Sequence, residues 1–142
     1  MTQNYWNKEC EDFVNNQIAL EYWASLQYHA ISSYFKHQSV GMENISKFFN
    51  KCSLEEREHA DKFVDYQNKR GGTVVIGEVK NINNNFYKSE SDKSNLLQAF
   101  ELALEMEQKV YENLLKLHKL GEKHDDPALS DFIEGEYLTE QI

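Results

Sequence analysis

The chain has 142 residues, of which 40% are hydrophobic and 27% charged, and its formal net charge is −9. This length accommodates one domain with a sizeable core, and the negative charge makes nucleic acid and anionic membrane surfaces poor partners. Neither a membrane-spanning apolar run nor a signal-peptide pattern is visible, and the two cysteines form no metal motif, so we expect a cytoplasmic protein with reduced thiols.

Three long helices and one shorter helix are predicted in chain order. Apolar residues recur at steps of three and four in three long segments, 7–36, 43–70 and 94–121. Glycines mark the expected ends of the second and third segments, at Gly71-Gly72 and at Gly121. The fourth helix is expected at 128–142, with Asp126 as its N-cap and a proline directly after it. The pattern predicts a single all-α domain over residues 1–142.

The connectors between these segments define the topology. Residues 37–42 and 122–127 are short, so we expect the helices that they join to be antiparallel neighbours. Residues 71–93 are longer, and about 14 extended residues already cover the roughly 45 Å length of a helix of about 30 residues. We therefore expect a four-helix bundle with a long crossover connector and a shortened fourth helix. The strand-like Thr73–Ile76 has no partner strand in the chain, so we expect it to pair with its copy in another subunit.

Charged residues interrupt the apolar faces at one level of the predicted bundle. Glu21, Glu56 and Glu107 each lie about 14 residues from the same end, which places them all at about 20 Å along the bundle axis. Gln141 on the fourth helix reaches the same level. Buried unpaired carboxylates cost much free energy, so this cluster implies a cation or other compensating partners. Glu56-x-x-His59 is the motif of di-iron bundles, and an imidazole among carboxylates favours iron over magnesium or calcium.

The predicted site is asymmetric. Its symmetric form would carry a second histidine three residues after Glu107, but that position is Val110. We therefore expect one of two irons to be held more loosely than the other. A single glutamate beside an apolar stripe is commonly a flanking residue that reaches solvent, whereas three at one level together with a histidine indicate a metal site.

Several segments closely resemble eukaryotic ferritins over nearly the whole chain. They are Leu20-Glu21, Glu55 to Asp61 (EEREHAD), Asn68 to Gly72 (NKRGG), Leu115 to Leu120 (LKLHKL) and Asp131 to Gln141 (DFIEGEYLTEQ). The resemblance implies a catalytic, heavy-chain-like subunit rather than a light chain. Such a subunit would oxidise Fe(II) with oxygen or peroxide, with two irons per subunit, and would mineralise Fe(III) inside a shell of 24 subunits.

The resemblance also implies roles for individual residues. Glu21, Glu56 and His59 would hold one iron, and Glu56 would bridge to a second iron held by Glu107. Two residues would orient ligands and solvent, Gln141 and Tyr28.

Two further groups of residues resemble functional features of the family. The lining of the channels through which iron enters the shell corresponds to Asp131, Glu134 and His118. Without the resemblance, acids in a first helical turn would be explained by the helix macrodipole. The cavity-facing acids that seed the mineral correspond to Glu55, Glu58 and Asp61, which alone would read as a solvated helix face.

Relative to that family, the fourth helix is shortened and a fifth helix is absent. We therefore expect an incomplete bundle end at which several apolar side chains lose a packing wall: Ile31, Phe35, Phe48, Leu97 and Phe100. Two alternatives to a ferroxidase stay open. One is a non-catalytic iron-binding or structural ferritin subunit whose assembly is impaired by the missing C-terminus. The other is a helical interaction module that uses the uncovered apolar groove.

Overall fold

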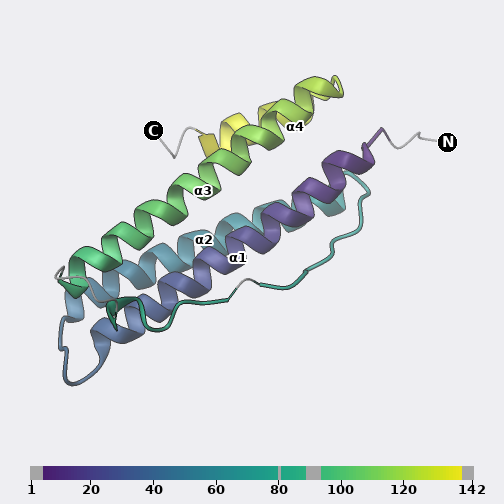
Figure 1. Cartoon of the computed structure of the whole chain (residues 1–142). Coiled ribbons are helices and arrows are strands. Elements are labelled where there is room, and N and C mark those ends of the chain that lie inside the picture. The colour runs from purple at the N-terminus through teal and green to yellow at the C-terminus, as the bar shows by residue number, and fades with distance from the viewer. Residues whose placement is uncertain (1–4, 80, 89–93, 139–142) are drawn as a thin grey trace.

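The computed structural model describes residues 5–79, 81–88 and 94–138. Within them it contains four α-helices, α1 (Lys8–Lys36), α2 (Glu43–Lys69), α3 (Asn95–Lys123) and α4 (Pro127–Ile133). A short 3₁₀ helix, η1 (Phe86–Lys88), precedes α3, and a π-helical turn, η2 (Glu134–Leu138), follows α4. Helix α1 packs along α2, α3 lies against α1, and α4 folds back onto α3 (Figure 1). The all-helical bundle expected from the sequence is confirmed.

Side-chain caps and a glycine motif define the helix ends. Asn7 and Ser94 cap α1 and α3 by accepting hydrogen bonds from backbone N–H groups in the first turn. After α2, Gly71 takes a φ of +81°. The N–H groups of Gly71 and Gly72 then donate to the carbonyls of Asn68 and Gln67, at 3.1 and 3.0 Å. This is the Schellman arrangement, which glycine favours because the first position requires a left-handed backbone.

The ends of α3 and α4 differ from the sequence expectation. Helix α3 runs two residues beyond Gly121, to Lys123. Gly121 is buried inside it, and a β-carbon there would lie 2.7 Å from Ser130 Oγ, so the glycine permits close packing of α4. The fourth helix was expected to be continuous over 128–142, but α4 ends at Ile133 and the chain continues as the wider turn η2. Gly135, a weak helix former, lies in this turn; residues 139–142 lie outside the described part of the chain.

Two pairs of serines join α1 to α2. The hydroxyls of Ser25 and Ser53 each donate to the other residue's backbone carbonyl, at 2.8 and 2.7 Å. About two turns along the helices, Ser32 and Ser46 repeat this exchange at 2.8 Å in both directions. All four side chains are buried. Their small size allows the two backbones to approach closely, and the hydrogen bonds satisfy the hydroxyls that this packing buries.

The long connector runs along α1 (Figure 1). Two side-chain amides of α1 hold it in place. Asn15 donates to the Thr73 carbonyl and accepts from the Val75 N–H, both at 3.0 Å. Gln27 exchanges two hydrogen bonds of 2.8 Å with the backbone of Asn83. In this chain the strand-like segment therefore bonds to helix side chains, while Val75 stays 57% exposed. Pairing of this segment with a copy in another subunit stays a prediction.

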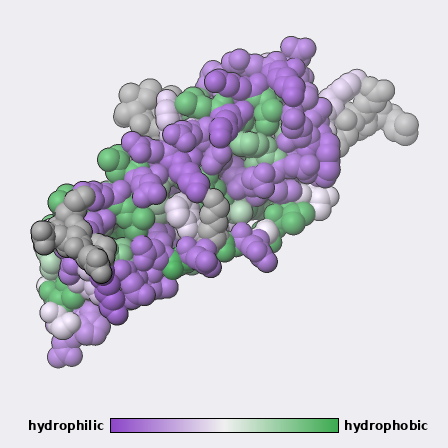
Figure 2. Space-filling view, in the orientation of Figure 1, coloured by the Kyte–Doolittle hydropathy of each residue, from purple (hydrophilic) through white to green (hydrophobic). Residues whose placement is uncertain are grey.

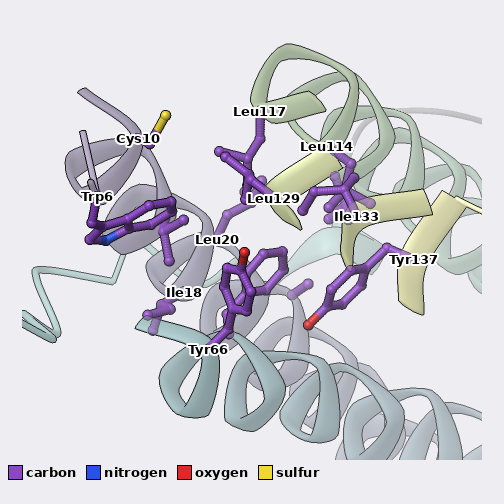
Figure 3. Close-up of a cluster of buried hydrophobic side chains, with 14 residues drawn as sticks. Trp6, Cys10, Ile18, Leu20, Tyr66, Leu114, Leu117, Leu129, Ile133 and Tyr137 are labelled. Atoms are coloured by element: carbon purple, nitrogen blue, oxygen red, sulfur yellow. The ribbon is translucent and has the colours of Figure 1, made fainter. Parts of the chain in front are cut away.

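The buried side chains form two clusters, one at each end of the bundle. Figure 3 shows the first, in which Leu129, Ile133 and Tyr137 pack against α1, α2 and α3. The second cluster includes Phe35 and Phe86. The outer surface is mostly hydrophilic on the face shown in Figure 2, with separate hydrophobic patches. None of the described helices is long and apolar enough to cross a membrane.

The expected loss of a packing wall is only partly correct. Ile31 and Phe35 are fully buried, with 0% and 1% exposure, so the prediction is wrong for these two residues. The reason is that η1 brings Phe86 from the connector to a ring-centroid distance of 6.4 Å from Phe35. Three other apolar side chains of α2 and α3 are 41–48% exposed: Phe48, Leu97 and Phe100.

Arg70, directly after α2, fixes the start of α4. Its guanidinium donates to both carboxylate oxygens of Asp126, at 3.0 and 2.6 Å. It also donates to the Tyr66 hydroxyl at 2.8 Å and lies 4.3 Å from the Trp6 ring centroid. Asp126 in turn accepts from the Leu129 N–H and caps α4. One arginine therefore connects the N-terminal segment, α2 and α4.

We predict that Gly72→Ala destabilises the fold and that Gly135→Ala does not. A β-carbon at Gly72 would lie 2.4 Å from Gln67 Oε1 and 2.7 Å from Trp6 Nε1, two atoms that share a buried hydrogen bond. We expect the free energy of unfolding to fall by about 1–3 kcal/mol. At Gly135 a β-carbon meets nothing within 4 Å, so the matched change should raise stability by about 0.4–1 kcal/mol. Urea unfolding measures both, and equal effects would contradict this packing.

We also predict an acid-sensitive contribution from Asp126. Burial raises the pKa of its carboxyl, but hydrogen bonds from Arg70 and from the Leu129 N–H outweigh burial and lower the pKa below its ordinary value of 3.8. Stabilisation by this carboxylate is therefore complete well above pH 3.8 and is lost as the pH falls through the lower folded value. Asp126→Asn should lower the urea midpoint at pH 7, and its difference from wild type should shrink towards pH 3. The exposed neighbour variant Asp125→Asn should leave the urea midpoint at pH 7 close to wild type.

Candidate metal centre

Helices α1 and α2 bring two carboxylates and an imidazole together inside the bundle. Glu21 comes from α1, while Glu56 and His59 lie one turn apart on α2. Their exposures are 0%, 4% and 9%. One potential ligand atom from each lies within 4.8 Å of the others. His59 Nδ1 is 3.7 Å from Glu21 Oε2 and 3.4 Å from Glu56 Oε2.

This cluster concentrates negative charge around one nitrogen base. Burial raises the pKa of Glu56 to about 8, and the nearby Glu21 adds to the effect. For His59, burial lowers the pKa, but the two carboxylates outweigh burial and raise the pKa to about 11. A protonated imidazole therefore compensates part of the charge in the metal-free protein. A bound cation would replace that proton.

Hydrogen bonding leaves one oxygen of each carboxylate available to a cation. Gln17 Nε2 donates to Glu21 Oε1 at 3.0 Å and so orients that carboxylate. Within the described residues, Glu21 Oε2 and Glu56 Oε2 are buried and accept no hydrogen bond. Buried polar atoms are normally satisfied, so these two oxygens fit a metal ligand set. Carboxylate oxygens with one imidazole suit a divalent transition metal such as iron.

Helix α3 contributes a third carboxylate beside this cluster. Glu107 is half-buried, and the Tyr28 hydroxyl donates to its Oε1 at 2.6 Å. Burial raises the pKa of Glu107, and the negative charge of Glu56 raises it further. Burial and the bond to Glu107 raise the pKa of Tyr28, so its hydroxyl stays protonated as a donor. Position 110, where a histidine would make the site symmetric, is a fully buried valine.

The other residues singled out from the sequence lie in three places. Gln141 lies outside the described residues. His118 Nε2, on α3, contacts Glu134 Oε1, in η2, at 2.7 Å, and Asp131 is exposed on α4. On α2, the three acids that resemble the mineral-seeding group are exposed: Glu55, Glu58 and Asp61.

Sequence reasoning assigned no role to two residues that adjoin the cluster. Gln17 orients Glu21, and its signal was an amide at a position within the apolar stripe of α1. Tyr137 donates to the His59 backbone carbonyl at 3.0 Å. No sequence signal showed what its hydroxyl contacts.

The fold and the cluster define a class of protein, the helical bundles that bind metal between carboxylates and histidine on facing helices. A family model described as a ferritin-like domain matches residues 11–142. The chain belongs to the ferritin family, as its resemblance predicted.

Curated relatives show how much of the family's length this chain covers. It is 46% identical over 140 residues to a chloroplastic ferritin of Malus baccata var. xiaojinensis, which covers 99% of this chain and 55% of the relative. A chloroplastic ferritin of Phaseolus vulgaris is 43% identical over 142 residues, covering 100% of this chain and 55% of the relative. The ferritin middle subunit of Aquarana catesbeiana is 45% identical over 141 residues, covering 99% and 76% respectively. The chain thus spans about half the length of these plant relatives.

We predict that Glu56→Gln lowers metal affinity and raises the stability of the metal-free protein. In the metal-free protein above about pH 8, where Glu56 is mainly ionised, the change removes one of the two buried carboxylate charges and leaves Glu21 opposite His59, at 3.7 Å. The thermal unfolding midpoint without metal should therefore rise, while the increase produced by anaerobic Fe(II) should shrink. The matched variant Glu112→Gln, at an exposed position of α3 outside every proposed iron site, should leave both values close to wild type. Equal Fe(II)-induced increases in the two variants would contradict the site.

Proposed function

We propose that this chain is an iron-oxidising ferritin subunit that stores iron as Fe(III). The observation that supports the proposal is the buried group of Glu21, Glu56 and His59, in which two carboxylate oxygens accept no hydrogen bond within the described residues. A structural bundle would gain stability from apolar side chains at these positions. Charged groups here favour a functional site over a purely structural core.

The residues of the site have separate roles in binding iron and in orienting ligands. Glu21, Glu56 and His59 bind one Fe(II), and the histidine releases its proton when it does so. Glu56 also bridges to a second Fe(II) bound by Glu107. Two Fe(II) ions then supply the two electrons that, with two protons, reduce dioxygen to hydrogen peroxide. Tyr28 orients Glu107 through their hydrogen bond of 2.6 Å, and Gln141 is proposed to orient ligands and solvent.

Access of iron and growth of mineral are assigned to the exposed acids. We propose that Asp131 and Glu134, with His118, line the channels of a 24-subunit shell and attract Fe(II) electrostatically. The contact between His118 and Glu134 supports their grouping. The acids proposed to seed the mineral on the inner face are Glu55, Glu58 and Asp61.

The proposed location is the cytoplasm. Cys10 and Cys52 are both free thiols, and burial raises the pKa of each to about 11, which keeps them unreactive. Free structural thiols are typical of a reducing compartment. The plant relatives carry the designation chloroplastic, and the Aquarana subunit carries no designation of compartment.

We predict that His59→Ala slows oxygen-dependent oxidation of Fe(II) at least about tenfold, because it removes the only imidazole of the site. The measurement is the initial rate of Fe(III) formation at two Fe(II) per subunit. His29→Ala is the matched control, since this histidine is exposed on α1. An unchanged rate in His59→Ala would overturn the ferroxidase proposal and favour a subunit that binds iron without oxidising it.

A further inference from the structure

The turn η2 brings a buried tyrosine against the candidate metal centre. Its five residues, Glu134–Leu138, form a π-helical turn, a wide turn that is frequent at functional sites. Tyr137 is 1% exposed although it carries a hydroxyl. Figure 3 shows this side chain directed from the C-terminal segment towards α2.

Tyr137 makes two contacts with the histidine of the cluster. Its hydroxyl donates to the His59 backbone carbonyl at 3.0 Å. Its ring meets the imidazole edge-on, with centroids 5.4 Å apart and planes at 81°. The tyrosine thus contacts both the backbone and the ring of one ligand, while Glu21 and Glu56 face the imidazole Nδ1.

The tyrosine is itself fixed by aromatic neighbours on α2 and α4. Its ring stacks on Phe63 at 4.3 Å with planes at 10°. The centroid of the Phe132 ring lies 5.6 Å from that of Tyr137, with the two planes at 74°. Phe63 lies one turn after His59 on α2, so the stacked pair holds Tyr137 beside the imidazole. A rigid neighbour of this kind restricts the rotamers open to a metal ligand.

We propose that Tyr137 is a positioning residue that holds the His59 imidazole with Nδ1 directed at Glu21 and Glu56. The proposal rests on the metal centre described under the proposed function. The π-helical turn η2 sets the direction of the Tyr137 side chain, because a wider turn changes the angular position of Tyr137 relative to a continued α-helix. Tyr137 does not ligate the metal. It acts through His59.

Tyr66 provides a matched control for ordinary core packing. It is also a buried tyrosine. Its ring stacks on Phe132 with centroids 4.0 Å apart, and its hydroxyl accepts a hydrogen bond from Arg70. It lies almost two turns beyond His59 on α2, and no contact joins the two side chains among those described. Loss of Tyr66 should therefore reduce stability without changing the metal centre.

The experiment is an anaerobic Co(II) titration of the full chain, followed by the visible d–d absorption of the bound ion. Tyr137→Leu, which removes ring and hydroxyl, should weaken Co(II) binding about tenfold and alter the spectrum. Tyr137→Phe, which keeps the ring, should weaken binding about two- to tenfold. Tyr66→Leu and Tyr66→Phe should lower the unfolding midpoint and leave both Co(II) readouts unchanged.

The outcomes separate the two proposals. Wild-type affinity and spectrum in both Tyr137 variants would overturn the positioning role, as would equal changes in the Tyr66 variants. If Tyr137→Leu does not fold, Tyr137→Phe alone decides. Loss of Co(II) binding in His59→Ala, with wild-type signals in both Tyr137 variants, would support the metal centre and exclude this inference. Wild-type Co(II) binding in His59→Ala would exclude the centre itself.

Discussion

The constraint on which the structure depends is the concentration of negative charge inside its core. Glu21 and Glu56 are buried around one imidazole, and Glu107 adds a third carboxylate at their edge. Like charges at this spacing repel, and desolvation adds a further cost. Without metal, the protonated His59 imidazole offsets only part of this cost, and contacts between the helices must offset the rest. The helices around the cluster therefore need contacts that resist separation.

Such contacts lie on both sides of the cluster along α1 and α2. About one turn from Glu21, the Ser25–Ser53 exchange of hydrogen bonds ties the two helices at close range. On the other side, Gln67 of α2 accepts from the Trp6 indole at 2.6 Å and donates to the Glu11 carbonyl. Polar contacts between helices are directional, so they fix the rotation of α1 against α2 as well as their separation.

The sequence predicts the grouping of Glu21, Glu56 and His59 better than it predicts the elements that support these residues. Helical rise is nearly constant, so counting residues from the helix ends was enough to place Glu21 and Glu56 together. The prediction that Gly121 ends the helix is wrong. In a sequence, a glycine that ends a helix cannot be told from one that allows another helix to pack closely, as Gly121 does against Ser130. Phe86 could not be assigned to the core, since it follows a polar connector whose path depends on amide groups of α1.

The attachment of that connector to α1 limits the insertions and deletions that the chain can tolerate. Asn15 and Gln27 bind it at two points that are about 18 Å apart along α1, and the residues between Val75 and Asn83 must bridge that interval. An insertion there would have to bulge outward or release one amide, which would leave buried Gln27 without its backbone partner. Beyond Asn83, η1 places Phe86 against Phe35, so the same argument extends through Lys88, the last residue of η1. Natural variation in loop length among homologous chains should therefore avoid the interval 75–88.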